Sequence, residues 1–282
     1  MPSGEASPSP GAAERAATAL RAARALVITA GAGMGVDSGL PDFRGTEGFW
    51  NAYPPYRRLG LSFEEAANPA RFEGDPAFGW GFYGHRLELY RATVPHPGFA
   101  LLRGWIERLG LASFVVTSNV DGQFQRAGFA EAAIEEVHGS IHHLQCTGPC
   151  GGAIWPNLER VPVDEETMRA LHVPTCPRCG EPARPNILMF GDFAWLAERS
   201  QGQHERLEAF LDEVGGGPLV AIELGAGTAI PTIRATTERL GERPGATAVR
   251  INPREPAIEA PHLSLPVGAL EGLRAIDAAL GG

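Results

Sequence analysis

The chain has 282 residues, of which 44% are hydrophobic, so it can bury a core as one large domain or as a main lobe with insertions. Its formal net charge of −9 argues against the broad phosphate-binding surface on which nucleic-acid affinity depends, so we expect no direct nucleic-acid partner. The first apolar run, Leu26 to Ala30, is far shorter than a membrane span and nothing resembles a signal peptide, so we expect a cytoplasmic protein with no membrane partner.

The N-terminal region is expected to lead from a tail into a nucleotide-binding turn. Residues 1–12 are rich in Pro, Ser and Gly and are predicted to be disordered, and residues 14–24 favour a helix before a strand at 26–30. The strand continues into GAGMGVDSGLPDFRG at 31–45. A glycine-rich turn after a strand lets backbone N–H groups approach a pyrophosphate, so a dinucleotide is the first ligand to consider. The usual GxGxxG spacing is not kept, which leaves an ordinary strand–helix turn as the alternative.

The rest of the chain predicts an α/β fold with two additional modules. Residues 49–94 are rich in aromatic residues and proline, which indicates an inserted set of short helices. Apolar strands at 112–117, 219–224 and 246–251 each end in a polar or glycine-rich loop, as does the strand at 26–30. Helical stretches separate these strands, so we expect an open parallel sheet with helices on both faces and ligands beyond its carboxyl ends.

The four cysteines predict a structural metal site. Three residues separate Cys146 from Cys150, two separate Cys176 from Cys179, and 25 residues lie between the pairs. This is the two-knuckle spacing of a tetrahedral zinc site, in which four thiolates leave no open position for catalysis. The segment that holds the cysteines has little periodicity, so we expect a small module held by something other than a core. Two disulfides are the alternative, which a cytoplasmic location disfavours.

His138, in EEVHGS, is a candidate general base. It lies in a predicted loop between the second strand and the first cysteine pair, and the ordinary pKa of histidine suits proton transfer near neutral pH. A purely structural histidine is the alternative. His142 and His143 lie close by, as spare metal ligands or with no role in the site.

Several segments, taken in order, carry a resemblance to a known family. They are GAGMGVDSGLPDFRG, TSNVDGQFQRAG, EEVHGS, the two cysteine pairs, RPNILMFGD, ELGAGTAIP and IN. Together they resemble the sirtuins (Sir2 family), NAD-dependent protein-lysine deacylases, in a divergent branch of bacterial type. The resemblance implies NAD and zinc as cofactors, an acyl-lysine protein or peptide as partner, and nicotinamide, O-acyl-ADP-ribose and free lysine as products. It also implies a Rossmann-like lobe (13–50, 95–141 and 186–282), a helical insertion (51–94) and a zinc module (142–185) within one catalytic domain, 13–282.

The resemblance also implies a role for each matching residue. His138 would be the general base, and Asn119 and Asp121 would hold the ribose and the nicotinamide amide. The other residues implied to bind NAD are Gly31, Ala32, Gly33, Asp42, Phe43, Arg44, Ser118, Gly225, Gly227, Thr228 and Asn252. Phe190 and Gly191 would pair with the substrate backbone.

Tyr83 and Arg86 have a Y-x-x-R spacing that resembles the branch of the family that removes succinyl and malonyl groups. In that branch a guanidinium and a phenol grip the distal carboxylate of the acyl group. A packing tyrosine beside a surface arginine is the alternative, because residues three apart commonly share a helix face.

Three positions depart from the family pattern. Gly35 stands where serine is usual, Ser118 stands where glutamine is usual, and Asp42 gives the DFR of deacetylases rather than the TFR of the acidic-acyl branch. A shorter side chain at Ser118 could admit water to the pocket. An NAD glycohydrolase or ADP-ribosyltransferase is therefore an alternative function, and a catalytically silent NAD- or peptide-binding module is another.

Overall fold

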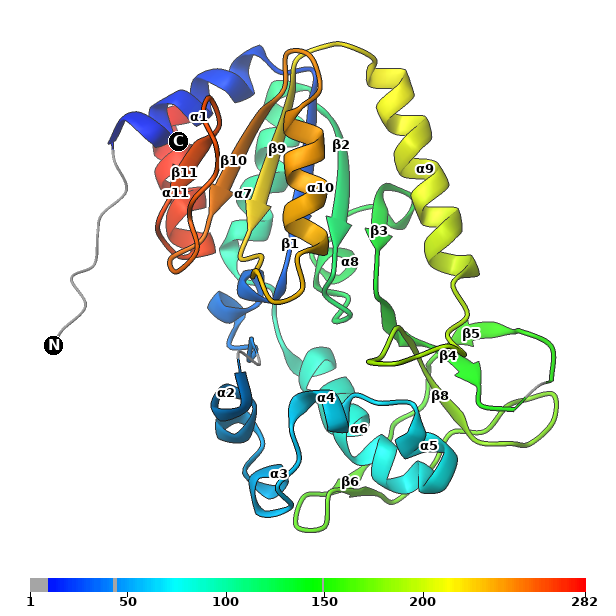
Figure 1. The fold of residues 1–282 in the computed structure, drawn as a ribbon. Helices are drawn as coiled ribbons and strands as arrows, with labels where there is room; N and C mark the ends of the chain where they lie inside the picture. Colours follow the sequence, from blue (N-terminus) through cyan, green and yellow to red (C-terminus); the bar gives the residue numbers. More distant parts are fainter. Residues whose placement is uncertain (1–9, 43–44, 149) are drawn as a thin grey trace, which may run out of the picture.

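A six-stranded parallel sheet lies at the centre of the larger part of the molecule, with helices around it (Figure 1). The structure is a computed structural model that describes residues 10–42, 45–148 and 150–282. The strand order is β11-β10-β9-β1-β2-β3, and every neighbouring pair is parallel. The strands are β1 (Ala25–Ala30), β2 (Ala112–Thr117), β3 (Ile134–Glu136), β9 (Leu219–Leu224), β10 (Thr247–Ile251) and β11 (Leu263–Leu265).

The strand order reverses beside β1, which fixes where a ligand can bind. The chain passes from β1 to β2 and β3 on one side and returns to β9, β10 and β11 on the other. In open parallel sheets the crevice outside the carboxyl ends at such a switch point is the usual ligand site. The four predicted strands correspond to β1, β2, β9 and β10, whereas β3 and β11 were not predicted.

Helices cover both faces of this sheet, which confirms the predicted fold class (Figure 1). Side chains alternate along β1, so that Leu26 and Ile28 enter one apolar core and Val27 enters the other. On the first face lie α1 (Pro10–Ala22), α7 (Pro97–Leu109) and α11 (Ala269–Leu280), and on the second lie α9 (Glu198–Val214) and α10 (Thr232–Gly241). Residues 10–12, expected in the tail, belong to α1, while residues 1–9 lie outside the described residues.

The start of α7 is tied to the glycine-rich turn that follows β1. His96 is the N-cap of α7, and its Nδ1 accepts a hydrogen bond from the Gly98 N–H at 3.0 Å. Because Nδ1 is an acceptor, Nε2 carries the proton and donates to the carbonyl of Met34 at 3.0 Å. One buried imidazole thus fixes both a helix terminus and the turn.

The helical insertion and the cysteine-bearing segment share a second core, rich in aromatic residues. The insertion, expected at 51–94, contains α3 (Pro54–Arg58), α4 (Phe63–Ala66), α5 (Ala70–Gly74) and α6 (Pro76–Ala92), and α2 (Gly45–Ala52) leads into it. It packs against an antiparallel sheet of β4 (Gly139–Cys146), β5 (Ile154–Pro156) and β8 (Ala183–Ile187), and against β6 (Val163–Asp164) and β7 (Arg169–Ala170). Trp80 joins the two parts, because its indole N–H donates to the Ala183 carbonyl at 2.7 Å.

This shared core corrects one expectation. Leu144, Val161 and Ala183 are buried with the aromatic residues of the insertion, so the cysteine-bearing segment does have an apolar core, built jointly with the helices. The division into lobe, insertion and zinc module remains a prediction. Among the described residues, no helix has both the length and the apolarity needed to cross a bilayer.

Candidate active site

A pocket of about 710 Å³ lies beyond the carboxyl ends of β1, β2 and β9, at the switch point of the sheet. Most of the predicted site residues line it: Gly31, Ala32, Asp42, Tyr83, Arg86, Ser118, Asn119, Asp121, His138, Phe190, Gly225, Gly227 and Thr228. Gly33, Gly191 and Asn252 do not line it, and Phe43 and Arg44 lie outside the described residues. Segments far apart in the sequence therefore meet at one place.

The floor of the pocket is formed by two glycine-rich loops in backbone contact. The Gly33 N–H donates to the Gly225 carbonyl at 3.0 Å, and a Cβ on Gly33 would lie 2.7 Å from the Gly225 Cα. Gly225 itself has φ of +60°, a conformation that favours glycine. Gly33 thus acts by close packing beneath the pocket, while Gly31, Gly225 and Gly227 line it.

Asn252 positions a carboxylate that the sequence analysis missed. Its buried amide donates to the Ala226 carbonyl at 2.8 Å, and its Oδ1 accepts from the N–H groups of Arg254 and Glu255 at 3.0 Å each. Glu255 lines the pocket, where its carboxylate accepts hydrogen bonds from the hydroxyl and the N–H of Thr228. A carboxylate at this end of a dinucleotide pocket can accept hydrogen bonds from a ribose. The signal was an acid three residues after Asn252, in the loop that ends β10.

Asn119 and Asp121 lie on the opposite side, in the loop that follows β2. The Asn119 amide donates to the Gly31 carbonyl at 3.0 Å, which links this loop to the turn after β1. One Asp121 carboxylate oxygen accepts from the Gln123 N–H at 2.9 Å. Burial raises the pKa of Asp121 to about 6, opposed by the hydrogen bond from Gln123 and supported by the charge of Glu136. Asp121 is therefore a buried acceptor at one end of the pocket.

His138 follows β3, the edge strand of the large sheet, and faces the pocket. Its carbonyl accepts from the Leu188 N–H at 3.0 Å, which holds it beside the segment after β8. Burial lowers the pKa of the His138 imidazole, and a hydrogen bond to the backbone of Ser118 opposes this shift only in part. The imidazole is therefore neutral at pH 7 and able to take up a proton.

Tyr83 and Arg86 lie together on α6, and both are buried in the pocket wall. The Arg86 Nε and Nη2 donate to the Tyr90 hydroxyl at 2.9 and 2.7 Å, and the guanidinium lies 5.6 Å from the centroid of the Tyr83 ring. These contacts place a positive charge among aromatic rings inside the pocket, which excludes a surface position for Arg86.

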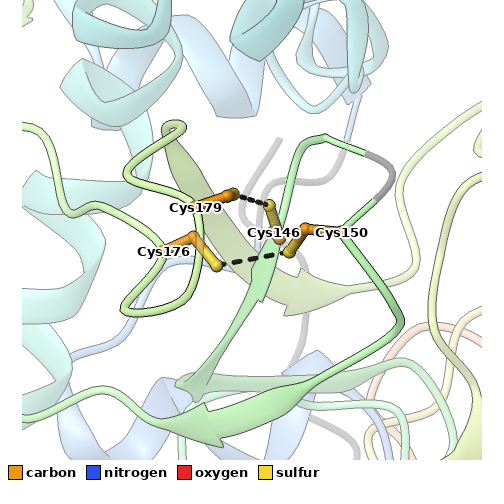
Figure 2. Close-up of side chains that lie close together, drawn as sticks. All are labelled: Cys146, Cys150, Cys176 and Cys179. Carbon is orange, nitrogen blue, oxygen red and sulfur yellow. Dashed lines mark hydrogen bonds between the residues drawn. The ribbon is translucent and has the colours of Figure 1, made fainter.

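The four cysteines converge on one another, as Figure 2 shows. None of them lines this pocket. The Sγ atoms of Cys146 and Cys179 lie 3.6 Å apart, those of Cys150 and Cys176 lie 3.4 Å apart, and all four fall within 4.8 Å of one another. A tetrahedral zinc ion with bonds of about 2.3 Å needs sulfurs roughly 3.8 Å apart, so the cluster fits zinc. All four cysteines are free, which argues against the disulfide alternative, and neither His142 nor His143 belongs to the cluster.

Comparisons with known proteins agree with this geometry. A model of the Sir2 family matches residues 31–210. The chain is 31% identical over 264 residues to an NAD-dependent protein deacylase of Thermus thermophilus, with 92% of each chain covered. It is 33% identical over 250 residues to one of Methylococcus capsulatus, covering 85% of this chain and 86% of the relative.

Solved structures lead to the same group of proteins. A Sir2 homologue in complex with NAD matches with a TM-score of 0.69 and 27% identity, covering 95% of this chain and 94% of the other. A Sir2 homologue in complex with ADP-ribose matches with the same TM-score and identity, covering 95% and 98% of the two chains. Fold and sequence thus point to the same group of proteins.

Proposed function

The chain belongs to the Sir2 family, and from this premise we propose that it is an NAD-dependent protein deacylase acting on acyl-lysine side chains. One observation carries the proposal: the loops after β1, β2, β3 and β9 bring Gly31, Asn119, Asp121, His138 and Gly225 to one pocket at the switch point. Acyl-lysine, NAD and one water would give nicotinamide, O-acyl-ADP-ribose and free lysine. The four cysteines would hold zinc as a structural ion, because a closed site of four thiolates has no position for substrate.

Each residue of the pocket has a chemical task in this proposal. NAD, when bound, supplies a ribose carbon as electrophile and accepts the acyl group. The buried carboxylate of Asp121 would accept a hydrogen bond from the nicotinamide amide. The neutral imidazole of His138 would take a proton from a ribose hydroxyl, a contribution typically worth about 10² to 10⁴ in rate. Glu255 would accept hydrogen bonds at the other end of the pocket, near the adenosine ribose.

Two further features are part of the same proposal. Tyr83 and Arg86 in the pocket wall favour an acyl group that ends in a carboxylate, since a guanidinium and a phenol can bind it together. The substrate is proposed to be an acylated protein or peptide, and the location to be cytoplasmic, which four free thiols suited to a metal support.

The test is a panel of acetyl, succinyl and longer-acyl lysine peptides incubated with NAD, with released nicotinamide and free lysine both measured. We expect nicotinamide release to depend on an acyl peptide and to fall at least 100-fold in His138→Ala, because the general base is lost. Steady nicotinamide release without peptide would instead identify an NAD glycohydrolase, the alternative that Ser118 suggested. Intact NAD in every mixture would refute the proposal.

A further inference from the structure

A second cavity adjoins the pocket described above, and Tyr90 and Asp121 line both. It has a volume of about 310 Å³, which is the room of about ten water molecules at roughly 30 Å³ each. A small molecule fits this volume, and a second dinucleotide does not. Arginine and histidine side chains make up much of the remaining lining: Arg91, Arg126, Arg199, His142 and His143. The partners of these side chains decide what the cavity can bind.

Arg199, on α9, is compensated by carboxylates. Its Nη2 donates to Glu136 at 2.5 Å and to Glu131 at 3.3 Å, and Glu131 lies at the exposed rim of the cavity. The Arg199 Nη1 is buried and has no hydrogen-bond partner among the described residues. This side of the cavity therefore has no excess of positive charge, although it keeps one unused donor.

Arg91 and Arg126 bond only to neutral groups among the described residues. Arg91, near the end of α6, donates to two backbone carbonyls at 2.5 and 2.6 Å. Arg126, the last residue of α8 (Gln123–Arg126), donates to the Arg91 carbonyl at 2.6 Å, which holds the two arginines together. Glu88, whose charge also acts on Arg91, is ion-paired with Arg160 at 2.8 Å. Because a guanidinium has five N–H donors, both arginines keep donors and positive charge for a ligand.

His142, on β4, links this cavity to the loop after β2. Its Nε2 donates to the Asp121 carbonyl at 3.0 Å. The ring lies against Gly122, where φ is +69° and an added Cβ would lie 2.6 Å from the His142 Cδ2, so only glycine suits this position. Burial lowers the pKa of His142, and the charges of Arg91 and Arg126 lower it further, opposed in part by the hydrogen bond to Asp121. The imidazole is therefore neutral and lies in positive surroundings.

We propose that this cavity binds a small dianion on Arg91 and Arg126, and that His142 passes the effect of the bound anion to the loop after β2. The ligand would be a compact molecule with a phosphate group or two carboxylates, because guanidinium groups bind both by charge-assisted hydrogen bonds. A negative charge beside His142 would favour its protonated form and so strengthen its hydrogen bond to the Asp121 carbonyl. The binding part stands alone, whereas the effect on NAD rests on the proposed function.

Calorimetric titration of the full chain with phosphate, malonate and acetate tests the binding part. ADP-ribose is present to occupy the first pocket, and the ionic strength is fixed so that screening stays constant. We expect one site per chain for a dianion and at least tenfold weaker binding of acetate, and the tighter dianion identifies the kind of ligand. Arg126→Met should weaken binding at least tenfold, because a charge-assisted hydrogen bond is lost.

Arg103→Met is the matched control. Arg103 is also exposed and also donates to a backbone carbonyl, at 3.0 Å, but it does not line the cavity. Its replacement should leave dianion binding unchanged. No saturable binding of either dianion, binding no tighter than that of acetate, or equal losses in Arg126→Met and Arg103→Met would overturn the site.

The affinity for NAD tests the effect on the loop after β2. A saturating dianion should lower the Kd for NAD about threefold and leave that for ADP-ribose unchanged, because ADP-ribose lacks the nicotinamide that Asp121 is proposed to bind. Linkage requires NAD to raise the affinity for the dianion by the same factor. His142→Phe cannot donate to the Asp121 carbonyl, so it should bind the dianion but lose this coupling. A Kd for NAD that is independent of the dianion would overturn the coupling, whereas absence of NAD-dependent turnover with dianion binding intact would refute the proposed function alone.

Discussion

Arg86 is the side chain on which the proposed preference for an acyl group ending in a carboxylate depends. Its guanidinium is buried, packed 5.0 Å from the centroid of the Phe82 ring, and bonded to the Tyr90 hydroxyl. A positive charge in such surroundings is poorly solvated, so a carboxylate that reaches it gains more than it would at the surface. An acetyl group has no such carboxylate.

Replacing Arg86 should therefore reduce desuccinylation far more than deacetylation. In Arg86→Met we expect desuccinylation to fall about 100-fold, from loss of a charge-assisted hydrogen bond, and deacetylation to change by less than about threefold. Initial rates on succinyl and acetyl versions of one peptide would measure this. Arg91→Met removes a guanidinium on the same helix that does not line this pocket, so it should affect both rates alike. Equal losses in Arg86→Met would show that Arg86 has only a packing role.

At the level of elements, the cysteine cluster connects the end of β4 to the segment that leads into β8, its antiparallel partner. Cys146 is the last residue of β4 and pairs in register with Ala183 of β8, and Cys176 and Cys179 lie just before β8 in the chain. A metal bound to all four thiolates would cross-link the end of this sheet. Its binding free energy would then contribute to the stability of the folded state.

Metal analysis of the purified protein should find one zinc per chain. Chelation should lower the thermal midpoint and expose the knuckles at 146–150 and 176–179 to proteases, because the cross-link is lost. Calorimetry and limited proteolysis before and after chelation would test this. Cys179→Ser should show the same changes without chelator and little further change with it. A protein with much less than one zinc, or one indifferent to chelation, would contradict the site.

The longer strands could be predicted from the sequence, and the short ones could not. The four strands predicted from apolar runs are present because each is largely buried on both faces and reads as a mainly apolar segment. Strands β3 and β11 have three residues each, too few for a periodic signal, and they form because a neighbouring strand supplies the hydrogen bonds. The joint core of the insertion and the cysteine-bearing segment was missed because it depends on contacts between distant parts of the chain.

Some residues of the candidate site could likewise be predicted from local sequence, and others could not. His138, Asn119 and Asp121 could be proposed from local motifs, and the structure places all three at one pocket. Glu255 was missed although an acid three residues after Asn252 was its signal, because nothing local shows whether such a carboxylate faces a pocket. Its place there depends on the hydrogen bonds that it forms with Asn252 and Thr228. Local sequence therefore indicates the chemistry of a site better than its boundaries.

At the scale of the whole molecule, burial of the charged Asp121 carboxylate at the pocket lowers the free energy of unfolding. Asp121 is buried at the pocket, where its pKa is about 6, above the ordinary value of 3.8. Between these two values the folded state binds more protons than the unfolded state, so its stability falls as the pH rises through that range. At pH 8 the buried charge costs about 3 kcal/mol, from 1.36 kcal/mol per pKa unit.

Asp121→Asn should therefore stabilise the protein while reducing its activity. The asparagine oxygen can still accept from the Gln123 N–H, but it carries no charge to desolvate. We expect the free energy of unfolding to rise by about 2 to 3 kcal/mol at pH 8 and by less than about 1 kcal/mol at pH 4, where Asp121 is protonated in the fold. Urea unfolding at both pH values would measure the gain. A variant less stable than wild type at pH 8 would show that the charge is stabilised in the fold.

Gln145 lies next to Cys146 at the end of β4, so a change at the metal site can reach the segment that the Gln145 amide holds. A peroxide that oxidises the thiolates would release the metal and free the end of β4, and with it the amide that holds Ala194 and Leu196. The glycine-rich loops after β1 and β9 belong to the other sheet and would stay in place. Oxidative damage would thus reach the segment after β8 before it reaches the glycine-rich side of the pocket.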